Sequence, residues 1–222
     1  MAQPWLQSLE LVSHPDLVIS SPDETLSDIA PILNRVVGID LDSGADVRKL
    51  KAAMATGNEA ASITGETRVV IGCEPMRVFG HLNRFSLVAV GATNLGPLTD
   101  PHRTPAATVG LHGFSQTTGA SDSSFSMQMI DDWGIDDVMA TAMDLASRQG
   151  PALAVLFDLS VLDPCFDTER TIPGGLDLRR LFRAARTCGR RPDVAAAGFV
   201  KAGSDLNLAY AVLSFCAGLA GR

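Results

Sequence analysis

Side chains that could do metal or nucleophilic chemistry follow several apolar runs of this sequence. The clearest is Asp158, which ends the run 152–158 and is followed by Ser160 and Asp163. Carboxylate, amide and hydroxyl oxygens are ligands that hard divalent cations accept. Glu74 and Lys201 also come directly after apolar runs, and Asn94 follows another run by three residues.

Nucleophilic catalysis is a second kind of chemistry to consider, at Ser160 or Cys165. Each would need a neighbouring base, and the sequence has neither a G-x-S-x-G turn nor a readable Cys-His pairing. We therefore interpret Ser160 as a turn hydroxyl and Cys165 as a core thiol. We expect the histidines to be surface or hydrogen-bonded structural residues rather than ligands; they are His14, His81, His102 and His112.

The elements that must position these residues alternate along the chain. Compact apolar runs predict buried strands at 16–20, 68–73, 86–91, 109–114, 152–158 and 194–200, with a short one at 36–41. Helical spacing of apolar residues predicts helices over about 21–35 and 45–56, from 135 to near 150, after Asp177, and from Asp205 to about 220. We expect Ser21 to cap the first helix, with Pro22 at its first position and Glu24 at its third.

This alternation predicts the fold class α/β, with a mostly parallel sheet in a three-layer α/β/α arrangement. Ligands of open α/β sheets lie at the carboxyl ends of the strands. Glu74, Asn94, Asp158 and Lys201 should therefore share one edge of the sheet. The length of 222 residues fits a single domain, 1–222.

Composition limits the partners. Apolar residues make up 46% of the chain and charged residues 19%, which predicts a folded protein whose surface is partly covered by other subunits. The formal net charge is −7 and the arginine pairs 179–180 and 190–191 are short, so we expect no nucleic-acid partner.

The compartment is inferred from the cysteines and the apolar stretches. Four scattered cysteines without C-x-x-C spacing predict reduced, mostly buried thiols. The first residues have no basic segment followed by an apolar run, and the stretch 206–220 is too short to cross a membrane. We expect a cytoplasmic protein with no membrane partner.

A family resemblance lies in the segment around Asp158. Residues 156–164 read L-F-D-L-S-V-L-D-P and are followed by P-G-G-L at 173–176. This resembles the ureohydrolase family (arginase, agmatinase, formimidoylglutamase), whose signature reads S-x-D-x-D-x-x-D-P with a later P-G-G-L. Over 69–75, V-V-I-G-C-E-P resembles the family's G-G-D-H; over 88–95, V-A-V-G-A-T-N-L resembles the strand ending in D-A-H-x-D. The similarity extends over residues 66–220.

The resemblance implies an arginase-like fold and a binuclear manganese site, whose shared hydroxide attacks a guanidinium carbon. This sequence departs from that site. Asp158 is the one strong ligand position retained, and Lys201 stands where the family has a glutamate near the substrate. The replaced ligand positions are Pro75 for histidine, Val90, Ala92 and Asn94 for Asp, His and Asp, and Ser160 for a bridging Asp.

The sequence therefore predicts a hydrolase-like pseudoenzyme without a metal cofactor. It would act as a structural or regulatory subunit or bind a small ligand, with a vestigial site of Asp158, Ser160, Asp163, Asn94, Glu74 and Lys201. The alternative is an active hydrolase of linear amidine C–N bonds with a remodelled manganese site. The resemblance also implies a homo-oligomer, or a hetero-oligomer with an active relative. A last hypothesis is that the Lys201 ammonium replaces a metal by pairing with Asp158, directly or through a water molecule.

Overall fold

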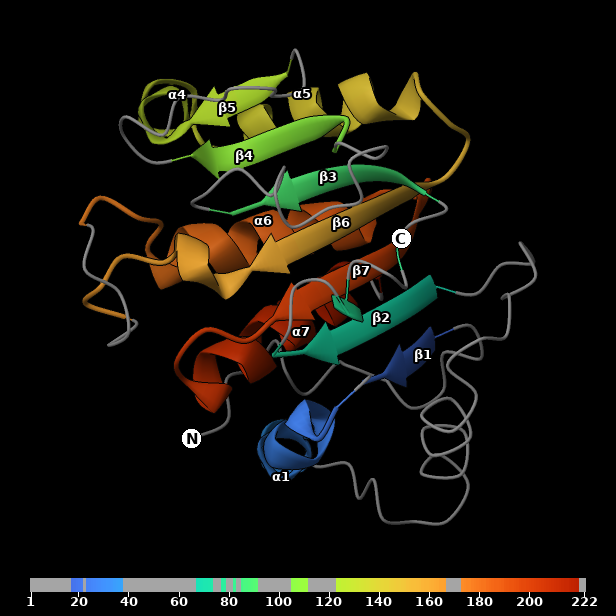
Figure 1. Cartoon of the computed structure of the whole chain (residues 1–222), viewed down its shortest axis with the longest axis vertical. Helices are drawn as coiled ribbons and strands as arrows, with labels where there is room; N and C mark the ends of the chain where they lie inside the picture. The colour runs from blue at the N-terminus through green and yellow to red at the C-terminus, as the bar shows by residue number, and fades with distance from the viewer. Residues whose placement is uncertain are drawn as a thin grey trace.

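Parallel strands form the centre of the molecule (Figure 1). The computed structural model describes residues 17–21, 23–37, 67–73, 77–78, 82, 85–91, 105–111, 123–166 and 173–219. In this part of the chain the strands are β1 (Leu17–Ser20), β2 (Thr67–Gly72), β3 (Ser86–Val90), β4 (Ala107–Leu111), β5 (Ser124–Ser126), β6 (Leu153–Asp158) and β7 (Val194–Val200). They lie in the order β1-β2-β7-β6-β3-β4-β5, and every neighbouring pair is parallel. β6, the strand that ends at Asp158, is therefore the central strand of the sheet.

Helices cover the sheet. They are α1 (Thr25–Val37), α4 (Met127–Trp133), α5 (Ile135–Ser147), α6 (Leu178–Arg190) and α7 (Asp205–Leu219), with a 3-10 turn η1 (Leu159–Val161) after β6. These helices share one apolar core with the sheet. A second core includes Val70 and Leu156 of the sheet together with Val78 and Leu82, which are themselves helical. The predicted three-layer α/β class is confirmed.

The apolar runs form the most buried strands. All six residues of β6 are buried. β7 has seven residues, and its last five are buried without a break. Phe157 of β6 stacks on Phe199 of β7 with ring centroids 5.1 Å apart, and Phe215 of α7 meets Phe199 edge-on. Such aromatic contacts add to the stabilisation from apolar burial alone. These contacts pack β6 and β7 against α7.

The later helices begin where their capping residues predict. The Asp177 carboxylate accepts a hydrogen bond from the Arg180 amide at 2.7 Å and so caps α6. α6 and α7 then approach closely. A Cβ added at Gly189 would lie 2.1 Å from the Phe215 carbonyl oxygen, so only glycine permits this approach of the two backbones.

Other predictions fail near the N-terminus and in the middle of the chain. Ser21 does not cap the first helix: α1 begins at Thr25, because the Thr25 amide donates to the Asp23 carboxylate and the Ser21 hydroxyl is bonded to Asp23. The strand expected at 36–41 is wrong at residues 36 and 37, which continue α1. β5 and α4 were not predicted. The helix expected over 45–56 and all four histidines lie outside the described residues.

Candidate functional site

Asp158 and Lys201 lie at the same edge of the sheet because β6 and β7 are paired in register. Asp158 is opposite Val200, and Lys201 is the next residue after β7. Asp158 is 7% exposed. One of its carboxylate oxygens accepts a hydrogen bond from the Ser160 amide at 2.9 Å, which starts the η1 turn. The retained carboxylate therefore already has a structural role.

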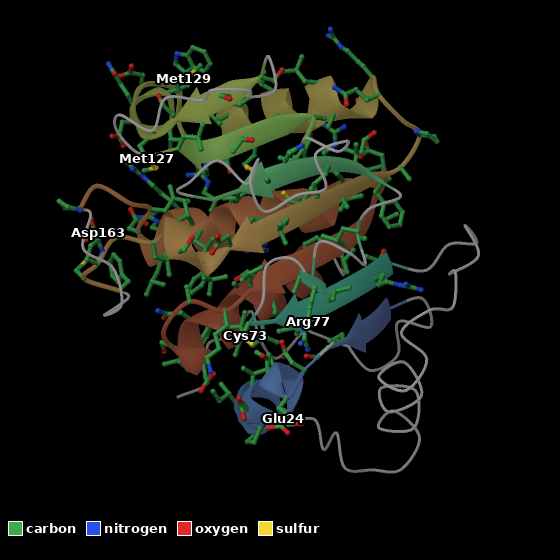
Figure 2. The ribbon with its side chains drawn as sticks, in the orientation of Figure 1. Glu24, Cys73, Arg77, Met127, Met129 and Asp163 are labelled. Atoms are coloured by element: carbon green, nitrogen blue, oxygen red, sulfur yellow. The ribbon has the colours of Figure 1, made fainter. Side chains whose placement is uncertain are left out.

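Residues 158–166, which we call the signature loop, are held by Asp163 (Figure 2). One carboxylate oxygen of Asp163 accepts from the Cys165 amide at 3.1 Å, and the other accepts from the Gly174 amide at 2.8 Å. These hydrogen bonds, that of Cys165 first, lower the pKa of Asp163 to about 2. The carboxylate thus links the signature loop to the P-G-G-L segment.

The same two segments also pack backbone against backbone. Leu162 forms a parallel bridge with Leu176. The Asp163 amide donates to the Leu176 carbonyl oxygen at 3.0 Å, and the Leu176 amide donates to the Val161 carbonyl oxygen at 2.9 Å. A Cβ at Gly175 would lie 2.4 Å from the Asp163 nitrogen and 2.6 Å from the Val161 oxygen. Asp163 of the D-P motif and both glycines of the P-G-G-L motif therefore have structural roles in joining these two segments.

Lys201 binds carboxylates other than that of Asp158. Its ammonium lies 2.6 Å from Asp205, in the first turn of α7, and 4.0 Å from Asp28 of α1. The hydrogen bond with Asp205 is the main cause that raises the pKa of Lys201. The hypothesis of a direct Lys201–Asp158 pair is wrong, because Asp205 offers a carboxylate only four residues away and Asp158 is bonded to the Ser160 amide.

Asp23 and Cys73, which the sequence did not single out, join the ends of β1 and β2. One Asp23 oxygen accepts from both the amide and the thiol of Cys73, at 3.0 and 3.2 Å. Burial raises the pKa of Asp23, but hydrogen bonds from Thr25 and Cys73 outweigh it and lower the value to about 2. Figure 2 shows Cys73 between β2 and α1, the helix that also carries Asp28. The 50 residues that separate this pair explain why no local pattern could reveal it.

The cysteines divide into two kinds. All four are free; Cys188 and Cys216 are buried as predicted, whereas Cys73 and Cys165 are exposed, so Cys165 is not the core thiol expected. The carboxylate of Asp163 raises the pKa of the Cys165 thiol, and Asp23 does the same to Cys73. Both thiols are thereby kept protonated, which is the opposite of an activated nucleophile.

The described residues do not fit a binuclear metal centre. No group of three or more histidine, cysteine or acidic side chains in this part of the chain is placed to hold a metal ion. Val90, at one position where the resemblance calls for an aspartate, is fully buried at the end of β3. Ser160 carries no charge, and Lys201 brings a positive charge to the same edge. Four further positions, Glu74, Pro75, Ala92 and Asn94, lie outside the described residues.

The fold that positions this site is the ureohydrolase fold. The formimidoylglutamase of Bacillus subtilis superposes with a TM-score of 0.70 at 13% identity, over 92% of this chain and 86% of that one. The agmatine ureohydrolase of Thermoplasma volcanium gives 0.63 at 11% identity, covering 97% and 91%. The arginase of Bacillus cereus gives 0.59 at 17% identity, covering 93% and 98%.

At these identities the likeness defines the fold rather than the activity. No protein-family model matches the chain, and no curated protein sequence matches it either. In the part of the chain that the structure describes, no helix has the length and apolar character needed to cross a membrane.

Proposed function

We propose that this chain is a catalytically silent protein built on the ureohydrolase fold. It serves as a structural or regulatory subunit, or binds a small ligand at the carboxyl edge of the sheet, without manganese. The proposal depends mainly on the surroundings of the Asp158 carboxylate. Asp158, the one strong ligand position kept, is buried and hydrogen-bonded to the Ser160 amide, while its partner position is a serine.

The charges at the edge support the same proposal. A metal pair is stable in a protein only where several carboxylates and imidazoles offset the loss of its hydration. Here Lys201 supplies a cation from the chain itself, and it is paired with Asp205 and Asp28. An ammonium fixed near the site repels further cations and occupies the acids that could bind them.

Retention of the signature loop is consistent with a scaffold. Asp163 and Gly175 are required by the hydrogen bonds and the close backbone packing of the loop, whatever the chemistry at Asp158. A protein under no demand for catalysis can therefore keep these motifs while losing ligands. The alternative, an active C–N hydrolase with a remodelled site, would need ligands from Glu74 and Asn94 in addition to Asp158 and Ser160.

A turnover assay tests the proposal. Purified protein is incubated with manganese and then with guanidino and amidino compounds, and the release of urea and ammonia is followed, with a Bacillus arginase as the positive control. We expect no release above buffer. Saturable turnover that disappears in Asp158→Ala would establish the alternative. Native mass spectrometry of the same preparation would identify any small ligand that co-purifies.

A further inference from the structure

One face of α6 carries a row of arginines. Arg179, Arg183, Arg186 and Arg190 are spaced at i, i+4, i+7 and i+11, which places them along one side of the helix, and all four are exposed. Arg183 forms an ion pair with Asp136 of α5. Among the described residues, no carboxylate lies within ion-pair distance of the other three.

The neighbouring helix carries an acidic row with the same spacing. Asp137, Thr141 and Asp144 of α5 are exposed at i, i+4 and i+7, and Asp132 and Trp133 precede them at the end of α4. Trp133 is 54% exposed, which is unusual for a side chain of its size.

The two helices that carry these rows, α5 and α6, are in contact with each other on one side of the sheet (Figure 1). Arg191, just after α6, joins Asp144 of α5 at 2.5 Å, and Arg180 of α6 joins Asp131 of α4 at 2.6 Å. These ion pairs fix the basic row next to the acidic row. We call the surface formed by both rows and Trp133 the α5–α6 face.

Such a face is complementary to itself. A two-fold axis that lies in the plane of this face, parallel to α5 and α6 and midway between them, sets the basic row of one copy on the acidic row of the other, twice over. An isologous dimer requires this kind of patch. Arg and Trp are enriched in protein interfaces, and a guanidinium can stack on the indole of Trp133.

Charge also selects this partner over others. The chain as a whole carries a net charge of −7, so two copies repel one another through most orientations. The α5–α6 face combines both signs and offers an attractive orientation. A nucleic acid would meet Asp132 and Asp137 beside the arginines, which disfavours a polyanion there.

We propose that a second copy of this chain docks on the α5–α6 face, forming a two-fold dimer through its arginine and aspartate rows. The proposal extends the assembly aspect of the proposed function and rests on it. Self-association is measured without metal or substrate, so its failure leaves the result of the turnover assay unaffected.

Sedimentation velocity over about 1 to 100 µM protein tests the dimer, with reversed charges as variants. The double substitutions are Arg179→Glu with Arg186→Glu, and Asp132→Arg with Asp137→Arg. None of these side chains has an ion pair in the described part of the chain. Each variant should therefore fold, which circular dichroism confirms independently. Glu24→Lys, in the turn just before α1 and at the far end of the sheet from α4, is the control (Figure 2).

We expect a dimer in the wild type and in the control. Each double variant alone should bind itself at least about tenfold more weakly, and an equimolar mixture of the two should recover a heterodimer, because reversed rows then face each other. Raising the salt from about 0.05 to 0.5 M should weaken the wild-type dimer. A wild-type monomer throughout the range, or an assembly that survives either reversal, would overturn the proposal.

Discussion

Replacing Lys201 with alanine removes the cation that joins β7, α7 and α1. The contact with Asp205 is short, 2.6 Å, and the two side chains are 26% and 40% exposed, so solvent screens the pair only in part. The contact with Asp28 is longer, 4.0 Å, and that side chain is 54% exposed, so it adds little. For a partly exposed pair of this kind we expect Lys201→Ala to lower the free energy of unfolding by about 1 kcal/mol.

A double-mutant cycle shows which carboxylate accounts for the loss of stability in Lys201→Ala. Urea unfolding is measured for Lys201→Ala, Asp205→Asn and the two combined, and in parallel for Lys201→Ala with Asp158→Asn. The coupling energy should be about 0.5–1 kcal/mol for Lys201 with Asp205 and below about 0.3 kcal/mol for Lys201 with Asp158. The opposite order would refute the reasoning, because it would mean that the ammonium belongs to the Asp158 site.

The pH dependence gives an independent check. The pKa of Lys201 is raised in the folded state, mainly by Asp205. Its contribution is therefore complete below the unfolded pKa of about 10.4 and is lost as the pH rises through the folded value. The stability difference between wild type and Lys201→Ala should stay constant from neutral pH to about 10 and shrink above it.

Two further substitutions test the local structure. A Cβ at Gly175 would lie 2.4 Å from a backbone nitrogen of the signature loop, so Gly175→Ala should cost about 2 kcal/mol in thermal or urea unfolding. Gly150→Ala, whose Cβ would meet only a serine side chain, is the matched control, and equal losses would contradict the packing argument. Asp23→Asn should lower the Cys73 pKa and speed its reaction with a disulfide reagent at mildly alkaline pH; an unchanged rate would argue against the hydrogen bond. Because the pKa of Asp23 is about 2, its contribution to stability is present above about pH 4, and wild type and variant should converge as the pH falls through about 2.

Sequence patterns predicted those elements whose signals are local. β6 is a continuous apolar run, and α6 begins at a capping aspartate, so both were placed to within a residue or two. β5 has only three residues, too short for a period to be visible. The start of α1 was misplaced because its real determinant, the Asp23 carboxylate, is also bonded to Cys73, which is remote in sequence.

The sequence predicted where the residues of the candidate site lie in the fold better than it predicted which side chains they contact. The rule that ligands gather at the carboxyl ends of parallel strands brought Asp158 and Lys201 to one edge. It could not say which way the lysine turns, because that depends on the carboxylates that α7 and α1 bring near it, first Asp205 and then Asp28. Long side chains choose among several carboxylates, and this choice is made by tertiary structure.

The metal content of the protein tests the central claim most directly. The purified chain is equilibrated with excess manganese, desalted, and analysed by inductively coupled plasma mass spectrometry beside Asp158→Ala. We expect far less than one manganese ion per chain, with no difference between the two proteins, because no group of three or more candidate ligands in the described part of the chain is placed to hold a metal ion. About two ions per chain in the wild type, lost in Asp158→Ala, would contradict it and establish a working binuclear site.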